Sequence, residues 1–152
     1  MPTTDMNIYA MCRRRTGLTQ EAWAEALDIS VESVKRYESG VRVPPNYLVK
    51  EMVDISGDEA LAYRHLANTS QVLEILPSIE SVNLQAATIR LMNRMARFAN
   101  QCRDRQLMEI ADDGIISADE QPLYAEILNE LKGIIAAYYQ LRYFEDDREE
   151  GR

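Results

Sequence analysis

The chain has 152 residues, 46% of them hydrophobic, and a formal net charge of −8. It contains no apolar run of about 18 residues and no signal-peptide core, which excludes a membrane-spanning helix and predicts a cytoplasmic protein. Six glycines and five prolines are few, and apolar and polar residues nowhere alternate for long in the manner of a strand. We therefore expect an all-α fold with one or two small cores.

Catalytic and metal-binding patterns are missing from the sequence. It has no nucleophile–base pair, no set of metal ligands and no glycine-rich phosphate loop, and His65 is its single histidine. We expect His65 to be an ordinary surface or interface residue, because no partner stands at ligand spacing from it. Cys12 and Cys102 are expected to be free buried thiols in a reducing compartment. These observations predict a protein that is not an enzyme and carries no cofactor or metal.

The first predicted helix runs from Met6 to Thr16, after a leader, residues 1–5, that we expect to be disordered. Arg13, Arg14 and Arg15 lie at the end of this helix, where cations complement the helix dipole. Contact with a phosphate is the alternative role for at least one of them.

Two short helices joined by a tight turn follow. Thr19 can cap a helix over residues 20–27, and Ser30 can cap a second one over residues 31–39. Asp28 stands in the turn and tolerates a left-handed backbone. The residues that helical spacing directs to a common core are Trp23, Ala24, Leu27, Val34 and Tyr37.

Fixed residue spacings in this stretch carry a resemblance. The chain reads T-Q-E-x-x-A-E-x-L, then I-S, then S-V-x-R-Y-E-x-G-x-R-x-P. This pattern resembles the lambda-repressor-like (Cro/Xre) helix-turn-helix family over roughly Met6 to Leu66. The chain departs from the family in Asp28, where glycine is usual, and in Trp23, where leucine is usual. The resemblance implies a five-helix DNA-binding domain over residues 6–68.

The resemblance also implies which residues contact double-stranded DNA. The second helix of the motif lies in the major groove in this family, and its expected base-contacting residues are Val31, Glu32, Ser33, Lys35 and Arg36. Arg36 can donate two hydrogen bonds to guanine, Glu32 can accept one from cytosine, and Val31 can pack on a thymine methyl. A solvated Glu32 without a base contact is the alternative. The expected phosphate contacts are Gln20, Arg42, Asn46 and Arg15.

Charge is distributed in a way that fits this division of the chain. Residues 1–50 hold seven basic and six acidic side chains, whereas residues 51–152 hold ten basic and nineteen acidic ones. The acidic excess therefore lies outside the expected DNA-binding surface, where it opposes phosphate binding less. Two more helices, over residues 46–55 and 58–67, are expected to complete the domain, with Leu48, Met52, Ile55, Leu61, Ala62 and Leu66 in its core.

A boundary is expected between Asn68 and Pro77, followed by one long helix from Val82 to Asp112. Its expected inward residues are Leu84, Ala87, Leu91, Met95, Phe98 and Cys102. Arg90, Arg94, Arg97, Arg103 and Arg105 are expected on its outward face. Such a row is typical of a solvated helix surface, with a second DNA contact as the alternative.

Residues 109–120 allow a calcium-loop interpretation, with Gly114 at the sixth position and Glu120 at the twelfth. Ala111 has no ligand atom where the third ligand is needed, so we prefer a local explanation. Gly114 ends the long helix, and Ser117 and Glu120 form a capping box for the next one.

The last predicted helix runs from Ala118 to Phe144 and carries two apolar stripes. Ile127, Leu131, Ile134, Tyr138 and Leu141 can pack on the long helix and form an antiparallel hairpin over residues 78–145. Leu128, Ile135 and Tyr139 belong to the second stripe and are expected to form a homodimer, because helix-turn-helix proteins bind paired half-sites. Coverage of the N-terminal domain is the alternative. The charged tail, residues 145–152, is expected to be disordered.

The hairpin also contains the sequence D-G-I-I-S-x-x-E, which resembles helical hairpins of some phage and prophage regulators. The sequence as a whole therefore predicts a sequence-specific DNA-binding transcriptional regulator, a dimeric repressor of phage or prophage type that occupies an operator. A protein-interaction module, such as an antitoxin or anti-regulator built on a helix-turn-helix scaffold, is the alternative.

Overall fold

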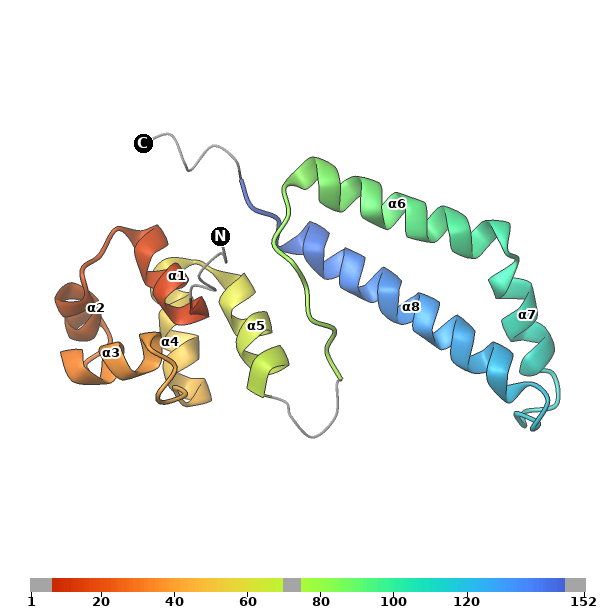
Figure 1. The fold of residues 1–152 in the computed structure, drawn as a ribbon, viewed down its shortest axis with the longest axis horizontal. Coiled ribbons are helices and arrows are strands. Elements are labelled where there is room, and N and C mark those ends of the chain that lie inside the picture. Colours follow the sequence, from red (N-terminus) through yellow and green to blue (C-terminus); the bar gives the residue numbers. More distant parts are fainter. Residues whose placement is uncertain (1–6, 70–74, 147–152) are drawn as a thin grey trace. The chain divides into compact units, whose positions relative to one another are not determined.

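The computed structural model describes residues 7–69 and 75–146, and within these ranges it contains eight α-helices and no strand (Figure 1). The expected all-α fold is thereby confirmed. The chain divides into two compact units, residues 1–76 and 77–152. The expected leader, residues 1–5, and residues 147–152 of the expected tail lie outside the described residues.

The first unit consists of five helices, as expected. They are α1 (Ile8–Thr16), α2 (Gln20–Ala26), α3 (Val31–Glu38), α4 (Asn46–Ser56) and α5 (Glu59–Thr69). Their shared core consists of Tyr9, Cys12, Trp23, Ala24, Leu27, Val34, Tyr37, Leu48, Val49, Met52 and Leu61. The expected burial of Ile55 and Leu66 is wrong, because both side chains are exposed and the inward face of α5 carries Tyr63 and His65 instead.

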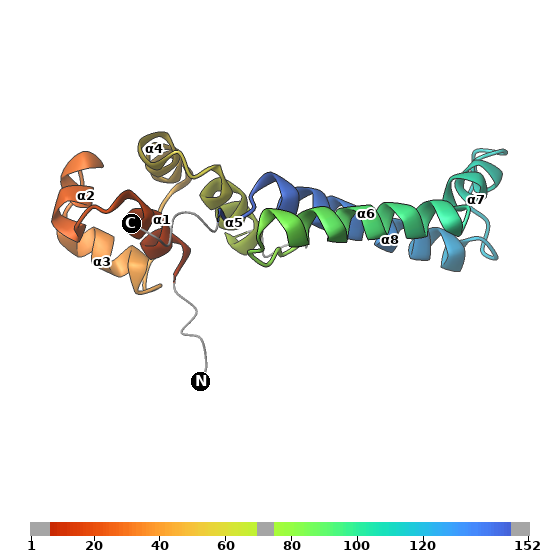
Figure 2. The same cartoon turned by 90° about the horizontal axis from the view of Figure 1, so that it is seen from above.

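The second unit is an antiparallel helical hairpin, which confirms the expected arrangement. Its long arms are α6 (Leu84–Asn100) and α8 (Gln121–Arg142), which lie side by side in both views (Figures 1 and 2), and α7 (Arg103–Ile110) connects them. The open end is tied by the backbone, because the N–H of Glu145 donates to the carbonyl of Val82 at 2.9 Å. None of the described helices has the length and apolar character needed to cross a membrane.

The expected single helix from Val82 to Asp112 is wrong, because α6 ends at Asn100 and α7 starts at Arg103. Cys102 breaks the helix with a left-handed backbone at φ 55°. Its side chain is exposed rather than buried, which corrects the expectation for this thiol, whereas Cys12 is buried as expected.

The break changes the direction of Arg103. In an unbroken helix, sixteen residues at about 100° each would turn Arg103 roughly 160° away from the buried Ala87. In the structure Arg103 is instead only 6% exposed. Its guanidinium binds the carboxylates of Glu126 and Glu130, with 2.7 Å between Nη2 and Oε1 of Glu130. The expected outward position of Arg103 is therefore wrong, because the left-handed residue turns it toward α8.

The turn between α7 and α8 is held by local hydrogen bonds. Gly114 adopts a left-handed backbone at φ 74°, and the N–H of Ile115 donates to Asp113 Oδ1 at 2.9 Å. Glu120 Oε2 accepts from the Ser117 N–H at 2.8 Å, which is the returning half of the expected capping box. The helix itself starts at Gln121 rather than Ala118. Within the described ranges, no cluster of His, Cys, Asp and Glu side chains could hold a metal ion.

Candidate nucleic-acid interface

The interface is built on α2 and α3, whose starts are set by side-chain caps. Thr19 Oγ1 accepts from the N–H of Ala22, and Ser30 Oγ accepts from the N–H of Ser33, both at 3.1 Å. Asp28 turns the chain between the two helices with a left-handed backbone at φ 51°. Asp is among the few residues other than glycine that adopt this conformation readily, so the departure from the usual glycine leaves the turn intact.

Three of the five expected base-contacting side chains share the exposed face of α3. They are Glu32, Lys35 and Arg36. Arg36 Nε donates to Glu32 Oε1 at 3.2 Å, and the two side chains remain 56% and 66% exposed. An exposed pair four residues apart on a helix is worth only about 0.3–0.5 kcal/mol. Either member can therefore exchange its partner for a nucleic-acid group at little cost.

The other two expected base-contacting residues are less accessible. Val31 is half-buried and packs against the core of the first unit. Ser33 is also half-buried, and its hydroxyl lies 2.9 Å from that of Ser30 within the helix cap. Both side chains are therefore only partly accessible to a base, and their contact with DNA stays a prediction.

A charged network that the sequence did not predict holds α1, α2 and α3 together. Arg13 Nε and Nη2 donate to the two carboxylate oxygens of Glu38 at 2.5 and 3.1 Å, and Arg13 Nη1 donates to the carbonyl of Leu18 at 2.8 Å. Both charged side chains are about nine-tenths buried. Burial by itself raises the pKa of Glu38, but the hydrogen bonds from Arg13 and Gln20 outweigh it and hold that pKa below its usual value.

Gln20 belongs to the same network. Its Nε2 donates to Glu38 Oε2 at 2.8 Å, so the side chain expected to contact a phosphate is already oriented by a buried carboxylate. A sequence signal for Arg13 did exist. Tyr9, Cys12 and Arg13 stand three and four residues apart, which puts Arg13 on the inward stripe of α1 rather than among the solvated cations at its end.

His65 is a buried structural residue, which corrects the expectation of a surface or interface role. It is 3% exposed. Its Nδ1 lies 2.8 Å from the Tyr9 hydroxyl, and its Nε2 lies 2.8 Å from Asn46 Oδ1. A carboxamide oxygen can only accept, so Nε2 carries the proton and Nδ1 accepts from Tyr9. Burial lowers the pKa of His65, which favours this neutral form.

Asn46 is the first residue of α4, and His65 fixes its side chain. The carboxamide oxygen is engaged by the imidazole, which leaves the amide group as the donor that Asn46 can offer to a phosphate. Arg42 lies in the preceding loop. Its backbone N–H donates to the carbonyl of Arg36 at 3.2 Å, and its guanidinium lies 5.9 Å from the centre of the Tyr37 ring.

Arg15 is held elsewhere in the first unit. Its Nη1 lies 3.5 Å from Asp58 Oδ2, in the turn between α4 and α5. The structure therefore brings α3, Gln20 and Arg42 into one region through contacts with Glu38, Arg36 and Tyr37, whereas Arg15 contacts Asp58.

The expected dimerisation residues lie on α8. Leu128 and Ile135 are 46% and 48% exposed. Tyr139 is half-buried, with its ring stacked on Tyr143 at a centroid distance of 6.1 Å. Tyr138 was expected to face α6 but is exposed, because it lies near the open end of the hairpin.

Comparison with known proteins gives one match. Neither the curated proteins nor the solved structures contain a significant match to the chain. A protein-family comparison matches residues 10–57 to a helix-turn-helix domain family. The match spans α1 to α4 and includes both caps, the Asp28 turn and the network of Arg13, Gln20 and Glu38. A helix-turn-helix domain suggests a DNA-binding regulator. Residues 10–57 of this chain thus match a helix-turn-helix domain of the Cro/Xre-like kind.

Proposed function

We propose that this protein is a sequence-specific transcriptional regulator that binds an operator as a dimer and represses by occupying it. The observation that carries the proposal is the exposed face of α3, which presents Glu32, Lys35 and Arg36 from the second helix of the motif. In helix-turn-helix proteins this helix enters the major groove. The resemblance of residues 113–120 to hairpins of phage and prophage regulators supports a regulator of that type.

Recognition of the DNA sequence would begin when the ion pair between Arg36 and Glu32 separates. Arg36 leaves Glu32 and donates two hydrogen bonds to O6 and N7 of a guanine, while Glu32 becomes free to accept from a cytosine amino group. Each such contact discriminates against a wrong base by about 1–3 kcal/mol, which exceeds the cost of separating an exposed pair. Val31 is half-buried, so its expected contact with a thymine methyl should contribute less to base discrimination than the contacts of Arg36 and Glu32.

Phosphate contacts would then set the register of the domain on DNA. Gln20 and Asn46 are the best-supported contacts, because Glu38 and His65 hold their side chains. Arg42 can swing from its position over the Tyr37 ring to an adjacent phosphate. Arg15 is the weakest of the four expected contacts, since Asp58 holds it.

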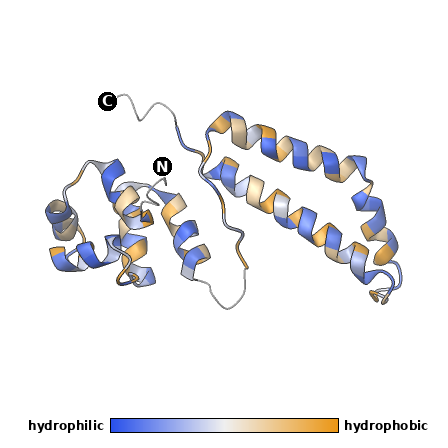
Figure 3. Ribbon diagram, viewed as in Figure 1, coloured by the Kyte–Doolittle hydropathy of each residue, from blue (hydrophilic) through white to orange (hydrophobic). Residues whose placement is uncertain are grey.

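The small apolar core of the second unit supports a dimer. The buried apolar side chains of the described part of the hairpin are small in number, namely Ala87, Ile110, Ile127 and Ala137. Figure 3 shows hydrophobic residues along both α6 and α8. The exposed apolar residues of the two helices include Leu84, Ile89, Met92, Met95, Leu128, Ile135 and Tyr138.

Helix geometry places several of these residues on the sides of α6 and α8 that are turned away from the space between the two helices. Arg94 and Arg97 of α6 line a pocket together with Glu126 of α8, so these residues mark one shared polar side. At about 100° per residue, Met92 and Met95 point roughly 170° and 130° away from the mean direction of Arg94 and Arg97, and Leu128 and Ile135 point roughly 160° and 180° away from Glu126. These four exposed residues, here called the apolar face, therefore lie on the sides of α6 and α8 turned away from the pocket, where a second copy can cover them as a four-helix bundle. A second copy is the partner that a reader of two-fold half-sites needs.

Selection of genomic fragments by the purified full chain at low and high salt tests the proposal. We expect a palindromic site whose recovery falls as salt rises, because Lys and Arg release counterions from the phosphates. Arg36→Ala should abolish enrichment of that site. Arg90→Ala removes the same charge from the second unit and should leave the recovered site unchanged.

Failure to enrich any fragment at low salt would contradict DNA reading. The helix-turn-helix domain would then serve as a scaffold, and the apolar face of the hairpin would become the surface that a protein partner binds, as in an antitoxin or anti-regulator. In that case Arg36→Ala would leave function intact, whereas charged substitutions at Leu128 and Ile135 would abolish it.

A further inference from the structure

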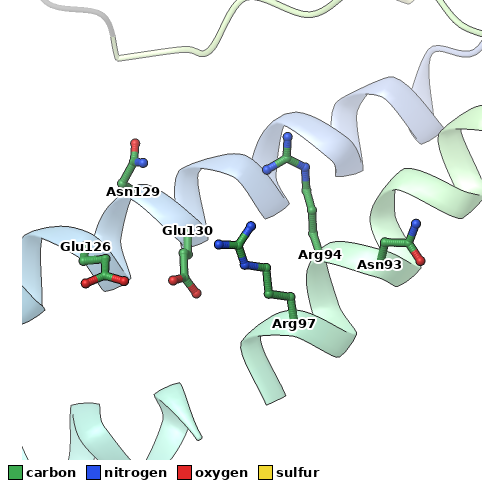
Figure 4. A pocket seen from close by; sticks show the side chains of 6 residues that line it. All are labelled: Asn93, Arg94, Arg97, Glu126, Asn129 and Glu130. Atoms are coloured by element: carbon green, nitrogen blue, oxygen red, sulfur yellow. The ribbon is translucent and has the colours of Figure 1, made fainter. Parts of the chain in front are cut away.

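A polar pocket lies between α6 and α8. It has a volume of about 420 Å³ and is lined by Asn93, Arg94, Arg97, Glu126, Asn129 and Glu130. Figure 4 shows Arg94 and Arg97 extending from α6 toward α8, with the Glu130 carboxylate directed to the same space. A volume of this size lies in the range that holds small molecules, about 300–1,000 Å³.

The positive charges of the pocket have no partner in the described part of the chain. Arg94 and Arg97 make neither an ion pair nor a hydrogen bond with any described residue. The two carboxylates of the pocket are bound instead by Arg103, which donates to both Glu126 and Glu130. Arg103 offsets one of the two negative charges, so the three arginines and two glutamates carry a net charge of +1, and the guanidinium groups of Arg94 and Arg97 are the ones left to bind an anion.

One acceptor in the pocket is also unused. Glu130 Oε1 accepts from Nε and Nη2 of Arg103 at 3.1 and 2.7 Å. Its other oxygen, Oε2, is buried and has no hydrogen-bond partner among the described residues. A buried carboxylate oxygen without a donor costs free energy, so the pocket favours an occupant that brings an N–H or O–H group to this atom.

Gly133 makes room for one of the arginines. A Cβ atom at this position would lie 2.3 Å from Arg94 Nη1 and 3.2 Å from Arg94 Cζ. Glycine inside a helix is unfavourable relative to alanine, and Gly133 lies near the middle of α8. The position of the Arg94 guanidinium across α8 therefore depends on the absence of a side chain at residue 133.

We propose that this pocket binds a small zwitterion, with its anionic group on Arg94 and Arg97 and its ammonium group on Glu130 Oε2. Guanidinium groups suit a carboxylate or phosphate because they donate two parallel hydrogen bonds. The ammonium group would supply the donor that Glu130 lacks. Such a ligand would bridge α6 and α8 and stabilise the hairpin increasingly as its concentration rises above Kd. This proposal does not depend on DNA binding.

Calorimetric titration of the full chain with three probes tests the proposal. The probes are O-phosphoethanolamine, inorganic phosphate and ethanolamine, which offer both charged groups, the anion alone and the ammonium alone. We expect O-phosphoethanolamine to bind at least about tenfold more tightly than either fragment, because charge-assisted bonds form at both ends. Equal affinity for O-phosphoethanolamine and phosphate, or no binding of either at millimolar concentration, would overturn the proposal.

Variants identify the residues responsible. Arg97→Gln should remove binding of both phosphate probes, whereas Arg90→Gln, on the same helix but paired with Glu80, should leave it unchanged. Glu130→Gln should abolish the advantage of O-phosphoethanolamine over phosphate. Gly133→Ala should displace Arg94 and weaken binding while the thermal unfolding temperature stays the same or rises, since alanine is the better helix former. Unchanged binding in Gly133→Ala and Arg97→Gln would place any bound anion elsewhere and refute the site.

Discussion

Glu38 joins the scaffold of the first unit to the candidate nucleic-acid interface. Its carboxylate accepts two hydrogen bonds from Arg13 of α1 and one from Gln20 of α2, while Glu38 itself ends α3. A buried carboxylate with several donors is stable only as long as all of them remain. The orientation of α3 and the side-chain position of Gln20 therefore depend on the same ion pair.

Glu38→Gln should destabilise the first unit by about 3 kcal/mol, because Arg13 keeps its charge in a nearly buried position without a counter-charge. Urea unfolding of the full chain measures the change. Glu25→Gln, on the exposed side of α2, should alter stability by less than about 0.5 kcal/mol. A change in Glu38→Gln as small as that of the control would show that the ion pair contributes little.

Acid should break the same pair. Because the pKa of Glu38 is held below its usual value of 4.5 in the folded state, the unfolded chain binds this proton first as pH falls. The stabilisation is complete above pH 4.5 and is lost as pH falls through the lowered pKa. Stability measured between pH 6 and pH 3 should therefore decline more steeply for the wild type than for Glu38→Gln.

His65 gives the first unit a second dependence on pH, at a higher range. Burial lowers its pKa below the usual 6.5, so the unfolded chain takes up this proton before the folded chain does. The free energy of unfolding should decrease as pH falls from about 6.5 toward the lowered pKa. His65→Gln should remove this decrease, and a wild-type stability that stays level between pH 7 and pH 5 would contradict the prediction.

At the scale of elements, the most informative feature is the break between α6 and α7. A left-handed backbone costs a residue with a side chain about 1–2 kcal/mol, and Cys102 adopts it although it is neither Gly nor Asn. In return, Arg103 turns inward and reaches two carboxylates of α8. The backbone strain at Cys102 is therefore offset by the buried charge network that Arg103 forms at the closed end of the hairpin.

Cys102→Gly should raise the free energy of unfolding by about 1 kcal/mol, because glycine adopts φ 55° without a steric penalty. Chemical denaturation of the full chain measures it. Ala99→Gly, inside α6, should lower stability by a similar amount, since there glycine only weakens a helix. Destabilisation by both substitutions would show that Cys102 is not strained.

At the scale of the whole molecule, the proposed division of labour assigns DNA reading to the first unit and pairing of two chains to the second. A monomer would contact one half-site only. Most of the affinity of the protein for a palindromic operator would therefore depend on dimer formation through the apolar face of the hairpin.

Leu128→Lys combined with Ile135→Lys should raise the dimer dissociation constant at least about a hundredfold, because burial of each such side chain is worth roughly 1.5–3 kcal/mol. Sedimentation equilibrium measures the constant, and operator affinity should fall with it. Asn129→Lys places a lysine on the polar side of α8 and should leave the dimer intact. A double variant that remains dimeric would locate the interface elsewhere.

The sequence by itself determined the class of fold, the five helices of the first unit and the helix-turn-helix motif. These features depend on local spacing, because caps such as Thr19 and Ser30 and the inward positions of Trp23 and Val34 are recognisable within one or two helical turns. The antiparallel hairpin followed from the same periodicity. The DNA-contacting and dimerisation residues remain predictions.

Tertiary structure alone decided which polar residues are buried and with which partners. Arg13 meets Glu38 across 25 positions, His65 meets Tyr9 across 56, and Arg103 meets Glu126 and Glu130 across 23 and 27. Local spacing places Arg13 on the inward stripe of α1, but it identifies none of these partners, because burial of such a residue is favourable only once the distant partner is in place. Cys102 shows the same limit for the backbone, since the strain there is offset by an ion pair on another helix.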